Sequence, residues 1–355
     1  MNLSNEITIE LYRINVLTNQ YVKIDEITTH QNLRWFDRLN GIGGCTFDLE
    51  IQDPKADITN WIPFITQTAI RVNNKIVWVG VVERTSGSYA GVNGKHSVRC
   101  MSYLYHLTTR FITLTYRDED AAAKAWDMID EVQSRNNGEM MIRKGTIETV
   151  GNTSDTLQNQ SVAQAIMNQS DNLVGYDFEL VPVQDASGKL SQVNFNAYNQ
   201  IGITRDRYAP LEFGFNVDSA TYSLDGEVFN NIIGEGAGTS TGVLSAAKSD
   251  GDSQVKYTRR ETIVPFKNIL SYTTLNTVTQ ARLDDVKNER WNVSVSLRKG
   301  SEYSYGAFDV GDFLQTNLVF PNGLIINQLA RVIELGYSVD KQGVITLEPK
   351  LEIIL

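Results

Sequence analysis

The chain has 355 residues, of which 41% are hydrophobic and 21% are charged, so its composition indicates a globular protein of two or three domains and excludes a disordered one. No apolar run reaches the length of a membrane span, and the N-terminus lacks the pattern of a signal peptide, so we expect synthesis in a cytoplasm. The net charge of −10 argues against tight binding to phosphate backbones, although an acidic protein can still line a passage along which nucleic acid slides.

The first part of the chain, residues 1–110, carries strand patterns separated by turn signals and no convincing helix pattern. The predicted strands are 7–12, 21–27, 45–51, 68–72, 75–84 and 96–104. Asn73 and Asn74 favour a hairpin turn, and the Gly/Ser/Asn-rich segment 85–95 is interpreted as a loop. Such a meander must close with other strands, so residues 1–110 are predicted to form a β-barrel or sandwich.

Residues 111–200 have a different texture, with helical periodicity as well as strand patterns. Acidic residues at 118–120 favour a helix start, and apolar residues then recur at helical spacing as far as Arg135. A second helix is predicted from Ser161, where Gln164 completes a capping box. The predicted strands of this part are 176–183 and 190–198. We therefore predict an inserted α+β domain over residues 111–200.

Strand patterns dominate again after residue 200. The predicted elements are strands at 214–224 and 228–233, a Gly-rich linker at 234–242, a polar segment at 243–260, a helix at 277–290, a strand at 291–298 and strands over 309–355. We interpret this part as a second β module, split into residues 201–242 and 299–355. Residues 243–298 are then a helix-strand segment inserted within it.

The end of the first β module and the end of the chain look alike. Residues 79–84 resemble residues 329–334, and each run is followed by a Gly-bearing turn and another strand. We match those following strands as 98–101 and 344–347. The sequence therefore predicts a mainly β protein with two similar β modules and inserted mixed domains.

Two segments resemble ligand-binding loops but are explained better in other ways. The glycines of 234–238 follow a strand, yet the segment lacks the Lys-Ser/Thr of a phosphate-binding loop. The segment 250–253 places two aspartates as calcium loops do, but it has neither the length nor the closing Glu of an EF-hand. A linker and a solvated loop are the favoured interpretations.

The residue types that most often carry chemistry do not form recognisable sites. His30, His96 and His106 lack metal-type spacing, and Cys45 and Cys100 give neither a disulfide framework nor a zinc motif. The carboxylate pairs on predicted helices are explained by exposed helix charge; they are Asp127 with Asp130 and Asp284 with Asp285. The sequence therefore predicts no enzyme activity, no catalytic residue, no metal site and no cofactor.

With this layout in view, the chain resembles the tail-hub proteins of long-tailed bacteriophages, also called baseplate hub or tail-tip proteins. The resemblance is carried by short motifs in a fixed order over nearly the whole chain. They are residues 43–49 with Asp53-Pro54, 78–83, 229–236, Arg260-Glu261, 310–312 and 330–334. The order of these motifs along the chain carries the resemblance.

The resemblance implies a fold with two tail-tube-type β modules, each with inserted domains. It also implies a homotrimer, a pseudo-sixfold ring that joins the tail tube or distal tail protein to a central spike or fibre and lets DNA pass without specific binding. We then expect a virion protein of the tail tip. The sequence departs from larger members because it stops at 351–355 with no lysin or fibre domain, so we expect any wall-cutting activity on another chain.

Two other functions are weighed against this one. A carbohydrate-binding adhesin of the tail tip is the main alternative, since β modules often present sugar-binding loops. Its aromatic candidates are Trp35, Trp61, Trp78, Trp126 and Trp291, for which core or interface packing is the simpler explanation. A peptidoglycan hydrolase is the second, and nothing in the motifs favours it.

Overall fold

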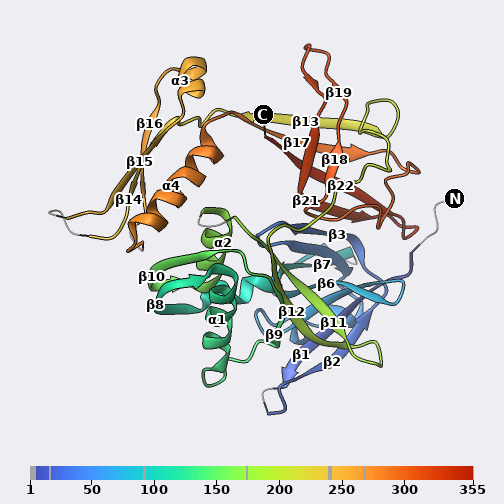
Figure 1. The fold of residues 1–355 in the computed structure, drawn as a ribbon. Coiled ribbons are helices and arrows are strands. Elements are labelled where there is room, and N and C mark those ends of the chain that lie inside the picture. Colours follow the sequence, from blue (N-terminus) through green and yellow to red (C-terminus); the bar gives the residue numbers. More distant parts are fainter. Residues whose placement is uncertain are drawn as a thin grey trace.

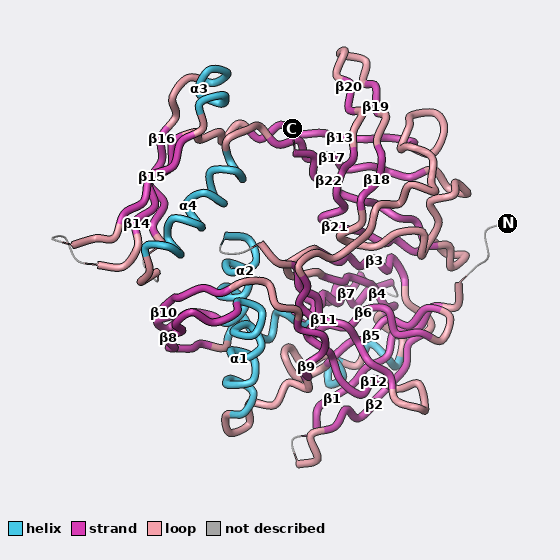
Figure 2. Tube along the Cα trace, viewed as in Figure 1, coloured by secondary structure: helices cyan, strands magenta, loops and turns pink. Residues whose placement is uncertain are grey.

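A long β-sheet runs through the molecule and connects its two β modules. The fold comes from a computed structural model, which describes residues 5–15, 17–90, 93–172, 175–238, 242–266 and 269–354. In these residues, twelve strands form one sheet in the order β13-β17-β22-β21-β3-β4-β7-β6-β5-β1-β2, with β18 paired to β21 (Figures 1 and 2). The mainly β class with mixed insertions, predicted from the sequence, is confirmed.

The first module contributes seven strands to this sheet. They are β1 (Ile7–Asn15), β2 (Gln20–Ile27), β3 (Gln31–Arg38), β4 (Gly44–Glu50), β5 (Gln67–Val72), β6 (Lys75–Ala90) and β7 (Asn93–Ser102), with short 3-10 helices at Pro54–Ala56, Ile58–Asn60 and Tyr103–Thr109. The interpretation of 85–95 as a loop is wrong, because β6 and β7 continue as a paired ribbon from Arg84 opposite Arg99 to Ala90 opposite Asn93. Hydrogen bonding between the strands maintains this ribbon even though its residues are polar and glycine-rich.

The second module repeats the arrangement with fewer residues. Its strands are β13 (Val217–Asp225), β17 (Arg290–Leu297), β18 (Phe313–Gln315), β19 (Leu318–Val319), β20 (Ile325–Ile326), β21 (Leu329–Val339) and β22 (Ile345–Ile354). One buried hydrophobic cluster joins the two modules: it includes Phe47 and Leu49 of the first and Val295 and Leu351 of the second. The modules therefore share a core as well as a sheet.

The first insertion packs directly on the first module. Its elements are β8 (Phe111–Asp120), α1 (Ala121–Ser134), β9 (Ile142–Ile147), β10 (Asn152–Ser161), α2 (Val162–Asn172), β11 (Asp177–Gln184) and β12 (Leu190–Tyr198). Asp120 caps α1 by accepting a hydrogen bond from the Ala123 N–H at 3.0 Å. The buried face of α1, with Ile129 at its centre, lies in one cluster with Ile76 and Val79 of β6. The strands β8, β9 and β10 were not predicted.

The second insertion is a small sheet covered by a helix, to one side of the molecule (Figure 1). Its elements are β14 (Asn231–Glu235), β15 (Ser245–Ser249), α3 (Gly251–Tyr257), β16 (Glu261–Pro265) and α4 (Tyr272–Val286), and its strand order is β15-β14-β16. Gly234 is therefore in strand β14 and not in a linker. A Cβ at this position would lie 2.1 Å from Thr279 Oγ1 of α4, so the absence of a side chain lets the helix pack closely on the strand. Part of the predicted linker, residues 239–241, lies outside the described residues.

The edges of this insertion differ from those read off the sequence. The predicted strand 228–233, placed in the second module, corresponds to β14, which pairs with β15 and β16. The predicted strand 291–298, placed in the inserted segment, corresponds to β17, which pairs with β13 and β22. Hydrophobic alternation identifies a strand but not its partner, which is why these two strands were assigned to the wrong sheets. The division of the chain into domains otherwise stays a prediction.

The two modules share their hydrogen-bonding register in detail. The pairing register of β6 with β7 shifts between Val82 and Arg84, and that of β21 with β22 shifts between Val332 and Glu334. We call this register shift, which resembles a β-bulge, the interruption. This matches the sequence likeness of 79–84 to 329–334. The likeness of the following strands was misaligned, because Cys100 opposite Val82 corresponds to Leu351 opposite Val332.

The modules meet where β3 pairs with β21. The antiparallel register runs from Glu334 opposite Arg38 to Ser338 opposite Arg34. At its centre the ring of Trp35 stacks on that of Tyr337, with centroids 4.8 Å apart and planes at 9°. Backbone pairing and an aromatic stack thus join the two modules, and we call this contact the internal joint.

Candidate functional site: the polar face of the joined sheet

Around the internal joint, strand alternation gives the long sheet one apolar and one polar face, whereas at β1, β5 and the start of β6 the first insertion covers the second face. In β4, Cys45, Phe47 and Leu49 are buried in the core, while Thr46 between them faces the other way. In β17, Val293 and Val295 point into the same core, and Ser294 lies on the opposite side. The polar positions of both modules therefore form one continuous surface.

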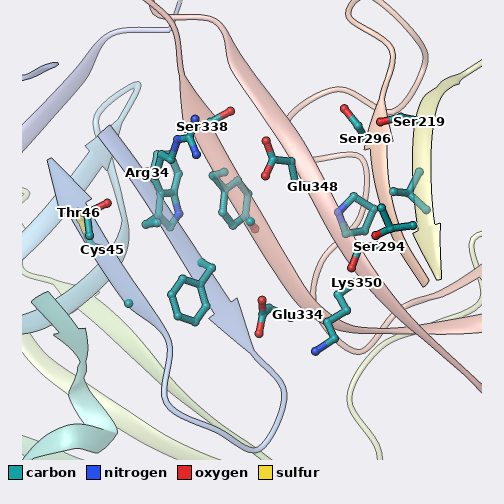
Figure 3. A pocket seen from close by; sticks show the side chains of 18 residues that line it. Arg34, Cys45, Thr46, Ser219, Ser294, Ser296, Glu334, Ser338, Glu348 and Lys350 are labelled. Atoms are coloured by element: carbon teal, nitrogen blue, oxygen red, sulfur yellow. The ribbon is translucent and has the colours of Figure 1, made fainter. Parts of the chain in front are cut away.

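This surface is hollowed at the internal joint. A hollow of about 600 Å³ is bordered by strands of both modules, and Figure 3 shows its labelled side chains. Its polar lining comprises Arg34, Thr46, Ser219, Thr221, Ser294, Ser296, Glu334, Ser338, Glu348 and Lys350. Six of these ten are serine or threonine, and the four charged side chains are two cations and two carboxylates.

The polar face continues on the first module in a second hollow of about 370 Å³, whose lining includes Asp48, Arg84, Ser97 and Arg99. Asp48 accepts hydrogen bonds from Ser97 at 2.5 Å and from Asn32 at 2.9 Å. Burial alone would raise the pKa of Asp48, but these hydrogen bonds and one from Lys95 lower it below its usual value. The carboxylate is therefore charged at neutral pH and offsets nearby cations.

The residues weighed as possible sites lie on separate elements. His96 is buried in β7 beside the Trp61 ring, and His106 contacts Gln67 through its Nε2 atom at 3.0 Å. Burial lowers the pKa of His30, His96 and His106, that of His106 to about 4. Among the described residues no group of three or more His, Cys, Asp or Glu side chains could hold a metal ion.

The two cysteines do come together, since Cys45 of β4 lies opposite Cys100 of β7. Both are free and buried. Burial raises the pKa of Cys45 well above its usual value and that of Cys100 to about 12, so neither forms a reactive thiolate at neutral pH.

Three of the four carboxylates weighed on helices have structural partners, and Asp130 is exposed on α1. Asp127 accepts a hydrogen bond from the Tyr116 hydroxyl at 2.8 Å, and Asp284 accepts one from Lys287 at 2.9 Å. Asp285 pairs with Arg282 at 2.6 Å. Asp250 accepts a hydrogen bond from the Ser253 N–H and so caps the short helix α3.

Comparisons with known proteins agree with this architecture. No protein-family model and no curated protein matches the sequence. Solved structures do match. The 43 kDa tail protein of prophage MuSo2 from Shewanella oneidensis has a TM-score of 0.61 and 13% identity, with 98% of each chain covered.

Two further matches are also tail proteins. A tail protein from Neisseria meningitidis has a TM-score of 0.58 and 11% identity, with 98% of this chain and 96% of that one covered. Prophage tail protein gp18 from Listeria monocytogenes has a TM-score of 0.56 and 13% identity, with coverage of 98% and 94%. The fold is therefore that of phage tail proteins, and the resemblance noted in the sequence is confirmed at the level of fold.

The polar face was missed by the sequence analysis, and so was β3, which the internal joint requires. The alternation of Thr46 and Asp48 with buried residues was visible, as was that of Ser294 and Ser296. Its meaning depended on the partner strands, because only the pairing places both sets on one surface. In the described part of the chain, no helix is long and apolar enough to cross a membrane.

Proposed function

We propose that this chain is a structural tail-hub protein of a phage virion. Three copies form a ring of six β modules that joins the tail tube to the tail tip and its spike or fibre. The observation that carries this proposal is the internal joint, in which two modules of the same register pair edge to edge within one chain. A ring follows when the same rotation is repeated until it closes.

The polar face is the surface proposed to line the channel. Its hydroxyls and balanced charges suit the passage of DNA, because phosphate binding requires an excess of closely placed cations. The acidic balance of the chain supports the same idea. The fold neighbours are tail proteins, which supports location in the virion tail and a role without catalysis.

The proposal is tested by measuring the stoichiometry of the chain, in solution by native mass spectrometry and in the virion by imaging the tail. A threefold ring at the end of the tube is the expected result. A monomer within purified particles would overturn the proposal. A zymogram on peptidoglycan should show no clearing by this chain, and a cleared band would contradict the non-enzymatic role.

The channel surface has its own test, which adds positive charge on the polar face. Ser294→Arg with Ser296→Arg should slow DNA release from triggered particles, and the delay should shrink as salt rises, because added cations bind phosphate. Ser245→Arg with Ser249→Arg, at two exposed positions of the second insertion, adds the same charge and is the matched control. Equal rates of DNA release in both variants would contradict the proposal that the polar face lines the channel.

A further inference from the structure

The internal joint has a counterpart that is open in the single chain. The shared register lets each position of the second module be matched to one of the first. Just before the interruption, Val332 of β21 corresponds to Val82 of β6. Beyond the interruption, Ser338 corresponds to Ser88. The strands before it match as well, since Phe313 pairs with Arg331 as Gln67 pairs with Val81. We call such matched positions register-equivalent.

Within the chain, one edge of β21 is used twice. Its first residues pair with β18, and beyond the interruption the segment Glu334–Ser338 pairs with β3. The register-equivalent segment of the first module is 84–88 of β6. In the described residues this segment pairs with β7 along one edge, and its other edge, beyond β5, has no partner strand.

The strand register-equivalent to β3 is β13. Both lie beside a matched strand, since Trp35 pairs with Cys45 of β4 as Tyr222 pairs with Val293 of β17. Apart from one bridge at Val217, the described residues give β13 no partner other than β17. Each chain thus has one open edge of the β21 kind and one of the β3 kind.

Exposure agrees with this assignment. Trp35 in the internal joint is 2% exposed, whereas Tyr222 at the open edge is 38% exposed and Leu224 is 49% exposed. Arg84, Ser86 and Ser88 are exposed in the same way along β6. An unpaired edge with exposed apolar side chains is a template for another strand, and natural proteins cover such edges.

We propose that segment 84–88 of β6 pairs antiparallel with segment 221–225 of β13 in a second copy of this chain. The register is that of the internal joint, with Ser86 opposite Ser223 and Ser88 opposite Thr221 of the neighbouring copy. This inference rests on the proposed ring and adds which edges join its protomers. The contact is heterologous, so every copy uses one edge of each kind and the chain of contacts can close.

The residue types support this register. Gly87 comes opposite Tyr222, and in the internal joint a glycine also faces an aromatic residue, one position away in register, where Gly336 comes opposite Phe36. An aromatic ring can cover a facing glycine in a sheet, and a Cβ placed at Gly87 would make only van der Waals contact, with Ile51 Cδ1 at 3.7 Å.

A paired-cysteine experiment tests the register. Residues directly opposite in an antiparallel pair have Cα atoms about 4.5–5.5 Å apart, within reach of a disulfide. Ser88→Cys with Thr221→Cys should form disulfide-linked dimers and trimers under mild oxidation, and neither single variant should form the trimer. The natural Cys45 and Cys100 are 2% and 0% exposed and do not compete.

The chain supplies matched controls. Ser338→Cys with Arg34→Cys is the register-equivalent pair of the internal joint, so it should close within one chain and give a cross-linked monomer. Ser88→Cys with Ser223→Cys shifts the pair by two residues, to about 7–8 Å, and should cross-link at least about tenfold more slowly. Unchanged circular dichroism confirms that each variant is folded.

Native mass spectrometry of the reduced Ser88→Cys/Thr221→Cys protein separates the two proposals. A threefold species that forms this disulfide supports both. A threefold species that does not form it, or that favours the shifted pair, overturns the edge pairing and leaves the ring intact. A chain that stays monomeric at every concentration and forms no disulfide overturns the edge pairing, and a monomer in the particle as well overturns the ring.

Discussion

The two β modules share a pattern of strand pairing, but the corresponding edge strand is paired in the first module and open in the second. The register of β6 with β7 shifts at the same place as that of β21 with β22. In the same way, β3 pairs with β4 as β13 pairs with β17. The first module covers its β3 edge with the second module, whereas the β13 edge of the second module is open in the single chain. At register-equivalent positions the covered edge has Trp35 and the open edge has the more exposed Tyr222. Register is thus common to the modules, and burial differs with the partner.

The two insertions differ in a parallel way. The first shares a hydrophobic cluster with the first module, including Tyr12, Ala69 and Ile76. The second has two small clusters of its own, centred on Val278 and Leu283 of α4. We therefore expect the first insertion to unfold with its module and the second to open independently.

The largest difference should appear at the paired aromatics. Trp35→Ala removes a buried ring stacked on Tyr337, so the free energy of unfolding of the isolated chain should fall by about 3–5 kcal/mol. Tyr222→Ala should cost about 1 kcal/mol or less, because its ring is partly exposed. Urea unfolding at a concentration where the chain is monomeric measures both. Equal losses of unfolding free energy would contradict the contrast between the paired β3 edge and the open β13 edge.

The insertions are compared by hydrogen exchange. Ile129→Ala in α1 should destabilise the first insertion and the first module together, by about 2–5 kcal/mol. Val278→Ala in α4 should speed exchange in β14, β15 and α4 while leaving the modules unchanged. If Val278→Ala accelerated exchange in β4 or β17 as well, the second insertion would not be an independent unit.

Much of the fold could be predicted from the sequence because local patterns determine it. The alternation in 45–51 and 291–298 identified β4 and β17, and helical spacing together with acidic residues identified α1. The likeness of 79–84 to 329–334 even matched the structural register. These features depend on neighbouring residues along one segment.

What could not be predicted depends on partners distant in sequence. The strand β3 has no clear alternation, since Trp35 is buried while Phe36 and Asp37 are both half-buried against the second module. Similarly, Gly234 resembled a linker residue until α4 was seen to pack against it. The polar face also needed the pairing of β3 with β21, and no local pattern encodes that contact.

A smaller effect should depend on pH at the internal joint. Burial raises the pKa of Asp37 to about 7, and the nearby carboxylates of Asp309 and Glu179 add to the shift. The folded chain therefore holds a proton that the unfolded chain releases near pH 4, so the stability contribution falls as pH rises from about 4 to about 7 and is constant above that.

Asp37→Asn removes this titration. Because Asp37 is only half-buried, the variant's free energy of unfolding should exceed that of the natural chain at pH 8 by about 1–2 kcal/mol, less than the value of about 4 kcal/mol that a shift of about 3 pKa units gives at full burial, and should match it at pH 4. Leu224→Asn, at the register-equivalent position of β13, is the control and should show no such pH dependence. A natural chain whose stability rises between pH 4 and pH 7 at this site would contradict the assignment.

The smallest effect is expected at the ion pair on the rim of the internal joint. The Arg38 Nε donates to Glu334 Oε2 at 2.8 Å, but the Arg38 side chain is 49% exposed. Glu334→Gln should therefore lower the free energy of unfolding by only about 0.2–1 kcal/mol, and the loss should shrink at high salt because exposed pairs are screened.

Arg84→Gln, at the register-equivalent position of Glu334, should leave the stability of the isolated chain unchanged, since the edge of β6 is open there. The same Arg84→Gln chain should form the threefold species more weakly, because Arg84 lies in the segment of β6 that is proposed to pair with β13 of a second copy. A loss of stability from Arg84→Gln in the monomer would mean that Arg84 already has a partner within its own chain, and the contrast between the closed and open edges would then fail.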